Sequence, residues 1–179
     1  MNTAIIKSNI ARIVAMSIAS LVAVLSLPTM ASASSMHYSP KVELPSIVAT
    51  AIAINKDSGE FSTLIAAASC TNIAERLSGR HPNYTLFAPT DAAFAKLQLN
   101  ANNVCSSFDK HTLTNILEYH ITRGKKPAEQ VLARKRLLMI NHQRAQIVGA
   151  TIAGQNIIQT DVYASNGIIH VIDGVMLPQ

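Results

Sequence analysis

Few of the residue patterns that mark enzymes and metal sites occur in this sequence. It has two cysteines and no Cys-x-x-Cys pair, no His-Glu-x-x-His motif, no Gly-x-Ser-x-Gly elbow and no glycine-rich phosphate loop. Zinc-protease, serine-hydrolase and nucleotide chemistry therefore lack the residues they usually need. We expect no enzyme activity, no cofactor and no metal site.

The histidines also lack the spacing of a metal-ligand set. His111 and His120 are nine residues apart, which would put them on opposite sides of a helix. His120 shares a helical stripe with apolar residues, so we expect a buried imidazole whose nitrogens are hydrogen-bonded to neighbouring elements. Contact with a ligand is the alternative. His170 alternates with isoleucines in a strand pattern, and the same argument applies to it.

The N-terminus has the pattern of a secretory signal. Lys7 and Arg12 precede an apolar run from Ile13 to Leu27, and the small residues Ala31-Ser32-Ala33 follow. This order of charged, apolar and small residues is typical of a cleavable signal peptide. The run has 15 residues, whereas a membrane anchor, the alternative, needs about 20. We predict a signal peptide over residues 1–33, cleaved near Ala33, and a secreted or periplasmic location.

The remaining 146 residues suit one domain. They hold 13 basic and ten acidic residues, a net charge of +3, which gives no reason to expect nucleic acid as a partner. The cleavage point has no cysteine that could carry a lipid, and the C-terminus has no apolar tail. We therefore expect no lipid anchor and no integral membrane anchor. We expect a polar lead-in over residues 34–45 and the domain over residues 46–178.

Both cysteines lie in this mature part. An exported chain meets an oxidising compartment, where an even pair forms a disulfide more readily than it stays as two thiols. We therefore expect a bond between Cys70 and Cys105, with free thiols as the alternative.

Apolar periodicity predicts helices in the first half of the domain and strands in the second. Helical spacing begins at Ile47 and is interrupted by one short strand at 84–88. The helical region then includes a helix that contains Leu113, and we expect this helix to end at Gly124. We expect Asn72 and Glu75 to form a capping box. Several strands follow from residue 137 to 177, and Asn166-Gly167 predicts a type I′ hairpin turn. This order indicates an α+β fold.

Three stretches together carry a family resemblance. They are Thr85–Phe94, Leu113–His120 and Ala164–Asp173. In this order and at these distances they resemble the two boundary motifs and the central Tyr-His motif of the fasciclin domain. The resemblance runs from about residue 46 to residue 178.

The resemblance implies a strand-rich wedge of two small sheets packed against a layer of short helices, with the two boundary motifs as neighbouring central strands. It implies a non-catalytic module for cell adhesion, biofilm or matrix contact, whose partner is a cell-surface or matrix protein or polysaccharide. In some animal members integrin contact is placed at positions that correspond here to Asp161-Val162 and Tyr119-His120. A small-molecule or lipid carrier that uses the seam between helices and strands is the alternative function.

One segment concentrates positive charge. Between residues 123 and 136 it holds six basic residues and a single acid, Glu129. A solvated helix with its flanks is one interpretation, and a contact surface for acidic polysaccharide or anionic lipid is the other. The six residues are Arg123, Lys125, Lys126, Arg134, Lys135 and Arg136.

Overall fold

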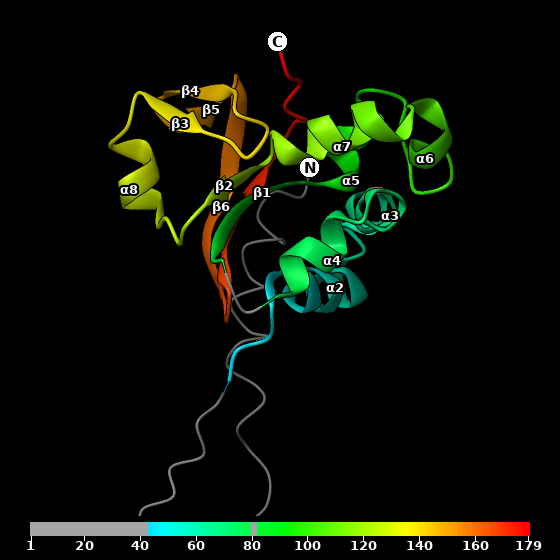
Figure 1. The fold of residues 1–179 in the computed structure, drawn as a ribbon, viewed down its shortest axis with the longest axis horizontal. Helices are drawn as coiled ribbons and strands as arrows, with labels where there is room; N and C mark the ends of the chain where they lie inside the picture. The colour runs from blue at the N-terminus through cyan, green and yellow to red at the C-terminus, as the bar shows by residue number, and fades with distance from the viewer. Residues whose placement is uncertain (1–42, 80–81) are drawn as a thin grey trace, which may run out of the picture. The chain divides into compact units, whose positions relative to one another are not determined.

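The computed structural model describes residues 43–79 and 82–179. The predicted signal peptide and residues 34–42 of the lead-in lie outside the described residues. Helices dominate the first half of the described chain and strands the second, as expected (Figure 1). In order, the elements are α2 (Ile47–Ser58), α3 (Ser62–Thr71), α4 (Ile73–Ser78), β1 (Tyr84–Pro89), α5 (Asp91–Ala95), α6 (Val104–Ser107), α7 (Lys110–Glu118), β2 (Ile121–Arg123), α8 (Ala128–Leu132), β3 (Arg136–Leu138), β4 (Arg144–Val148), β5 (Thr151–Ile152), β6 (Gln155–Ala164) and β7 (Gly167–Ile172).

Polar caps fix where several of these helices begin and end. The Ser46 hydroxyl accepts a hydrogen bond from the Ala49 N–H at the start of α2, and Gly59, with φ 71°, ends that helix. Thr90 caps α5 in the same way. The predicted capping box at Asn72 is wrong. Asn72 has a left-handed backbone (φ 63°) that ends α3, and its side chain makes no cap hydrogen bond.

The strands form one seven-stranded sheet in the order β2-β1-β7-β6-β5-β4-β3. The two boundary motifs lie side by side near its centre, because β1 and β7 pair in parallel with Leu86 opposite Ile169. The α+β fold is confirmed, but the strands form one continuous sheet and not the two small sheets that were expected. The edge strands meet: the Ile140 N–H donates to the Ile121 carbonyl (2.9 Å) and the Thr122 hydroxyl to the Leu138 carbonyl (2.7 Å). The sheet therefore curls round on itself.

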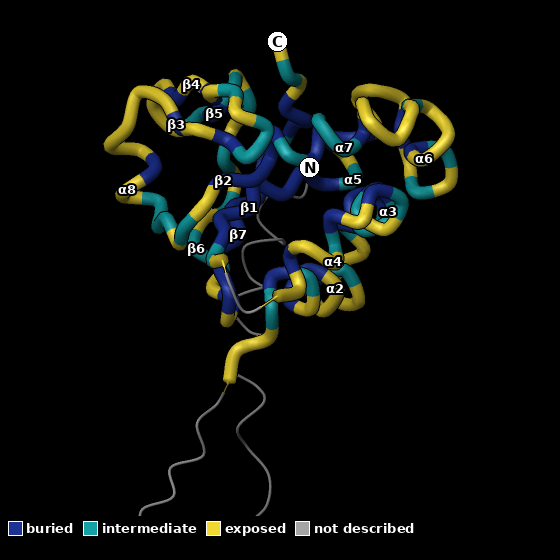
Figure 2. The backbone as a smooth tube through the Cα atoms, in the orientation of Figure 1, coloured by how far each residue is buried: buried dark blue, intermediate teal, exposed yellow. Residues whose placement is uncertain are grey.

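Apolar side chains fill both sides of the central strands. Every residue of β1 and β7 is buried (Figure 2), as expected of strands that are covered on both faces. Helices α2–α7 lie on one side, and α8 with β3–β5 lies on the other (Figure 1). The core inside the curl consists of Phe87, Tyr119, Val131, Leu137, Met139, Ala145, Ile147, Ile152, Ile172 and Met176.

The hairpin between β6 and β7 attaches the sheet to the first helices. Its turn residue Asn166 is buried; its side-chain oxygen accepts from the Ile47 N–H (2.8 Å), and its amide donates to the carbonyls of Leu77 and Gly79. The predicted type I′ turn is wrong, since neither Asn166 nor Gly167 has a positive φ. Gly167 is needed for space instead, because a Cβ there would lie 2.1 Å from the Tyr84 carbonyl oxygen.

Candidate functional site

The expected disulfide is present and lies among the helices. Cys70 of α3 and Cys105 of α6 are bonded, with Cα atoms 6.1 Å apart. The bond ties α6, a short helix of four residues, to the helical layer. It therefore acts on the scaffold of the helical layer.

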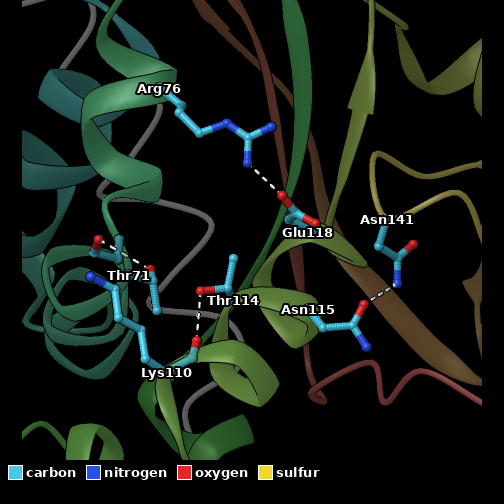
Figure 3. Close-up of polar contacts among 8 residues, drawn as sticks. Thr71, Arg76, Lys110, Thr114, Asn115, Glu118 and Asn141 are labelled. Atoms are coloured by element: carbon cyan, nitrogen blue, oxygen red, sulfur yellow. Dashed lines mark hydrogen bonds and ion pairs between the residues drawn. The ribbon is translucent and has the colours of Figure 1, made fainter.

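The Tyr-His motif lies where α7 gives way to β2. The helix ends at Glu118 rather than at Gly124 as predicted, because Ile121 pairs with Leu86 of β1 and so begins a strand. Two contacts hold this end of α7 in place (Figure 3): Arg76 of α4 forms an ion pair with Glu118, and the Asn141 amide donates to the Asn115 side chain at 3.0 Å. The motif is thus a clamped junction between the helical layer and the sheet.

His120 is a core histidine, as expected. It is 1% exposed, its Nδ1 lies 2.8 Å from the Ile116 carbonyl oxygen, and its Nε2 accepts from the Met176 N–H at 2.9 Å. These partners require a neutral ring that carries its proton on Nδ1. Burial lowers the pKa of His120 from 6.5 to about 4. Both nitrogens are therefore engaged within the domain.

His170 and Asp161 form a second internal network, around the loop that enters α8. His170 Nε2 lies 2.9 Å from the Lys126 carbonyl oxygen, and its Nδ1 accepts from the Asp161 N–H at 3.2 Å. The Asp161 carboxylate accepts from the Ala128 N–H at 2.9 Å. Asp161 has φ 60° and occupies an irregularity in β6, whereas Val162 next to it pairs regularly with Ile169. Burial lowers the pKa of His170 as well. The structure gives Asp161 a role within the fold, and its contact with a partner stays a prediction.

The six basic residues of the charged segment are distributed over β2, the entrance to α8, the α8–β3 loop and β3. All are exposed except Lys126, which is partly buried. Its pKa is lowered by desolvation and by the nearby charge of Arg134. Within residues 43–79 and 82–179, none of the six forms an ion pair with an acid. Their charge is therefore available to an external partner.

Two hollows flank the Tyr-His motif. An apolar pocket of about 150 Å³ lies between α2, α3, α4 and the strands, and His120 forms part of its wall. A larger hollow of about 530 Å³ lies over β3, β4 and β5, and Tyr119 forms part of its wall. Adjacent residues of one motif thus line two different spaces.

The family follows from comparison with known proteins. The family model described as "Fasciclin domain" matches residues 59–178. This chain belongs to the fasciclin domain family. Protein sll1483 of Synechocystis is 39% identical over 127 residues, which cover 66% of this chain and 67% of the relative. The pig transforming growth factor-beta-induced protein ig-h3 is 30% identical over 133 residues, which cover 72% of this chain and 19% of that protein.

A solved structure supports the fasciclin fold independently. It is a FAS1 domain pair from the insect cell adhesion molecule fasciclin I, with a TM-score of 0.59 and 18% identity. The match covers 76% of this fasciclin domain chain and about half (52%) of the insect one. At this identity the likeness concerns the fold.

The acids of the fasciclin motifs have structural partners. The Asp91 carboxylate accepts from the N–H groups of Ser62 and Thr63, and that of Asp173 accepts from the backbone and side-chain N–H groups of Asn156. No group of three potential metal ligands occurs in the described part of the chain. Nor does any described helix have the length and apolar character needed to span a bilayer.

Sequence reasoning missed one charged residue of interest. Arg144 lies outside the basic segment in sequence, but β4 pairs with β3 and places Arg144 diagonally across from Arg136 on the exposed face. Alternation along β4 was the available signal: Arg144, Gln146 and Val148 are exposed, and the residues between them are buried.

Proposed function

We propose that this fasciclin domain is an exported binding module that contacts cell-surface, biofilm or matrix components through its surface. In this proposal residues 1–33 are the signal peptide, residues 34–45 the lead-in and residues 46–178 the binding domain. Kinship with a domain pair from a cell adhesion molecule supports adhesion as the function. Mass spectrometry of the protein recovered from the medium or envelope tests export: a mature chain that begins at Ser34 is expected.

One observation carries the choice of surface. The polar groups around His120 and His170 already form hydrogen bonds within the domain. The cations of the basic segment, in contrast, form no ion pair with an acid among the described residues. Unpaired cations attract an acidic polymer, and salt screens that attraction. An acidic polysaccharide on the outside of a cell is therefore the partner that we propose.

Salt-dependent binding to a sulfated polysaccharide tests this. The double variant Lys135→Glu/Arg136→Glu reverses two charges of the segment. Lys56→Glu/Lys110→Glu is the matched control, since it reverses two exposed charges on α2 and α7. We expect the first pair to weaken binding at least ~10-fold and the control to change it little, with the difference shrinking at high salt. Equal effects of the two pairs would contradict the proposed surface.

A second candidate function rests on the apolar pocket. Its volume of about 150 Å³ is close to that of an engineered cavity that binds benzene, and it is smaller than the roughly 300 Å³ at which drug-sized sites begin. A whole lipid does not fit, so the carrier alternative is limited to a small apolar molecule. Native mass spectrometry after gentle purification separates the two functions, since a reproducible bound mass is expected of a carrier alone.

A further inference from the structure

The larger hollow has the composition of a built site. Its floor is the exposed face of β3, β4 and β5, and Leu177 and Gln179 complete its wall. Arg136 lies directly opposite Gln146, and Arg144 is two residues along from Gln146 on the same strand. Such diagonal neighbours on one face of a sheet are roughly 7–8 Å apart. Both guanidinium groups can therefore reach a single anion between them.

These two arginines have no neutralising partner. Neither forms an ion pair with an acid anywhere in the described parts of the chain. Two like charges on adjacent strands repel each other and lower stability. Because Arg binds carboxylate and sulfate-like groups through a planar fork of donors, the pair is suited to an incoming anion.

Tyr119 supplies an independent observation. It is 5% exposed, and its ring belongs to the core inside the curl. Its hydroxyl makes no hydrogen bond with any described residue, although it is not sealed from solvent. Since Tyr119 lines the hollow and its hydroxyl is open to solvent, an external group in that space can serve as its hydrogen-bond partner.

We infer that this hollow is a subsite for one anionic sugar residue, a sulfated sugar or a uronic acid, of an acidic polysaccharide. Arg136 and Arg144 hold the anionic group, and the Tyr119 hydroxyl bonds to a sugar oxygen. The volume of about 530 Å³ lies within the range of about 300–1,000 Å³ that is typical of small-molecule sites. Gln146 offers a further donor and acceptor, and Leu177 an apolar surface for the ring. The inference rests on the proposed polysaccharide contact and assigns it a specific place.

Single-charge variants distinguish this subsite from general attraction. Arg144→Gln and Arg136→Gln each remove one charge inside the hollow. Arg123→Gln removes one charge of the same basic segment outside it and is the matched control. Tyr119→Phe removes only the hydroxyl. The protein, with its disulfide intact, is titrated calorimetrically with a sulfated disaccharide and with its unsulfated counterpart, and thermal unfolding of each variant is recorded.

The expected result is a loss of ~10-fold or more in affinity for Arg144→Gln and for Arg136→Gln, and a smaller but measurable loss for Tyr119→Phe. Arg123→Gln should change affinity less than ~2-fold, because it keeps every contact of the hollow and loses only screened long-range attraction. The unsulfated sugar should bind more weakly than the sulfated one. Melting temperatures should not fall, since these side chains make no hydrogen bond or ion pair within the described protein.

Other outcomes overturn the inference in distinguishable ways. Equal losses for all three arginine variants would mean that charge acts over the whole surface, which refutes the subsite and leaves the proposed function standing. Binding to anionic phospholipid vesicles without binding to the disaccharide would refute the sugar ligand. No binding of either the disaccharide or a long sulfated polysaccharide would refute both the subsite and the proposed function.

Discussion

Acidification should destabilise this domain through His120, well above the pH at which carboxylates protonate. The neutral ring accepts the Met176 N–H through Nε2, and a protonated ring would lose that acceptor. The unfolded chain binds a proton with the ordinary pKa of 6.5, and the folded chain with a pKa of about 4. The unfolded state therefore gains protons first as the pH falls.

The sign and size follow by linkage. The contribution is fully present above pH 6.5 and is lost progressively as the pH falls toward 4. Between pH 7 and pH 4 the free energy of unfolding should drop by about 3 kcal/mol from this residue alone. That is a large share of the roughly 5–15 kcal/mol of a typical domain.

Urea unfolding followed by circular dichroism at pH 7, 6, 5 and 4 measures the drop. His120→Gln removes the titration, while its amide still offers a donor and an acceptor. This variant should start less stable and lose about 3 kcal/mol less over the same pH range. His142→Asn, at an exposed turn position with φ 67°, is the control, since asparagine tolerates this backbone conformation. Parallel losses in the wild type and His120→Gln would refute the reasoning.

Three further changes test the scaffold. Gly167→Ala places a Cβ 2.1 Å from the Tyr84 carbonyl oxygen and should cost roughly 3 kcal/mol or more in urea unfolding, or prevent folding; a near-neutral result would show that the strands yield easily. Asn166→Ala leaves its three buried backbone partners unpaired and should cost roughly 3–5 kcal/mol, with hydrogen exchange accelerated first in α2. Cys70→Ser/Cys105→Ser opens a loop of 35 residues' separation and should cost roughly 3–4 kcal/mol. An unchanged melting temperature would count against that last value.

The class of fold and the buried histidines were predictable because they depend on patterns that persist along the chain. The stripe that ends at His120 marks a buried position whether or not the helix continues that far, so burial was predicted correctly even though α7 ends at Glu118. The point at which it ends depends on β2 pairing with β1. That contact joins segments distant in sequence, and local periodicity carries no information about it.

Most of the failures concern residues whose role depends on contacts outside their own segment. Asn-Gly is a typical type I′ turn sequence, but here both residues serve long-range packing. Asn166 hydrogen-bonds to the first helices, and Gly167 leaves room for the Tyr84 carbonyl. Asparagine often caps the start of a helix, but Asn72 adopts a left-handed backbone conformation that ends α3. Arg144 gains its neighbour only through strand register. Asn166 and Gly167 take their roles from contacts with the first half of the domain, and Arg144 takes its neighbour from strand pairing, which residue type alone does not indicate.

The parallel pairing of β1 with β7 also sets the order of events during synthesis. The middle of the sheet contains the last strand of the chain, and the turn before it holds α2, the first described helix. The N-terminal half therefore cannot complete its packing until the C-terminal strand has left the ribosome. Contacts between such distant segments slow folding, so a nascent chain that still lacks β7 should stay incompletely packed and accessible to chaperones.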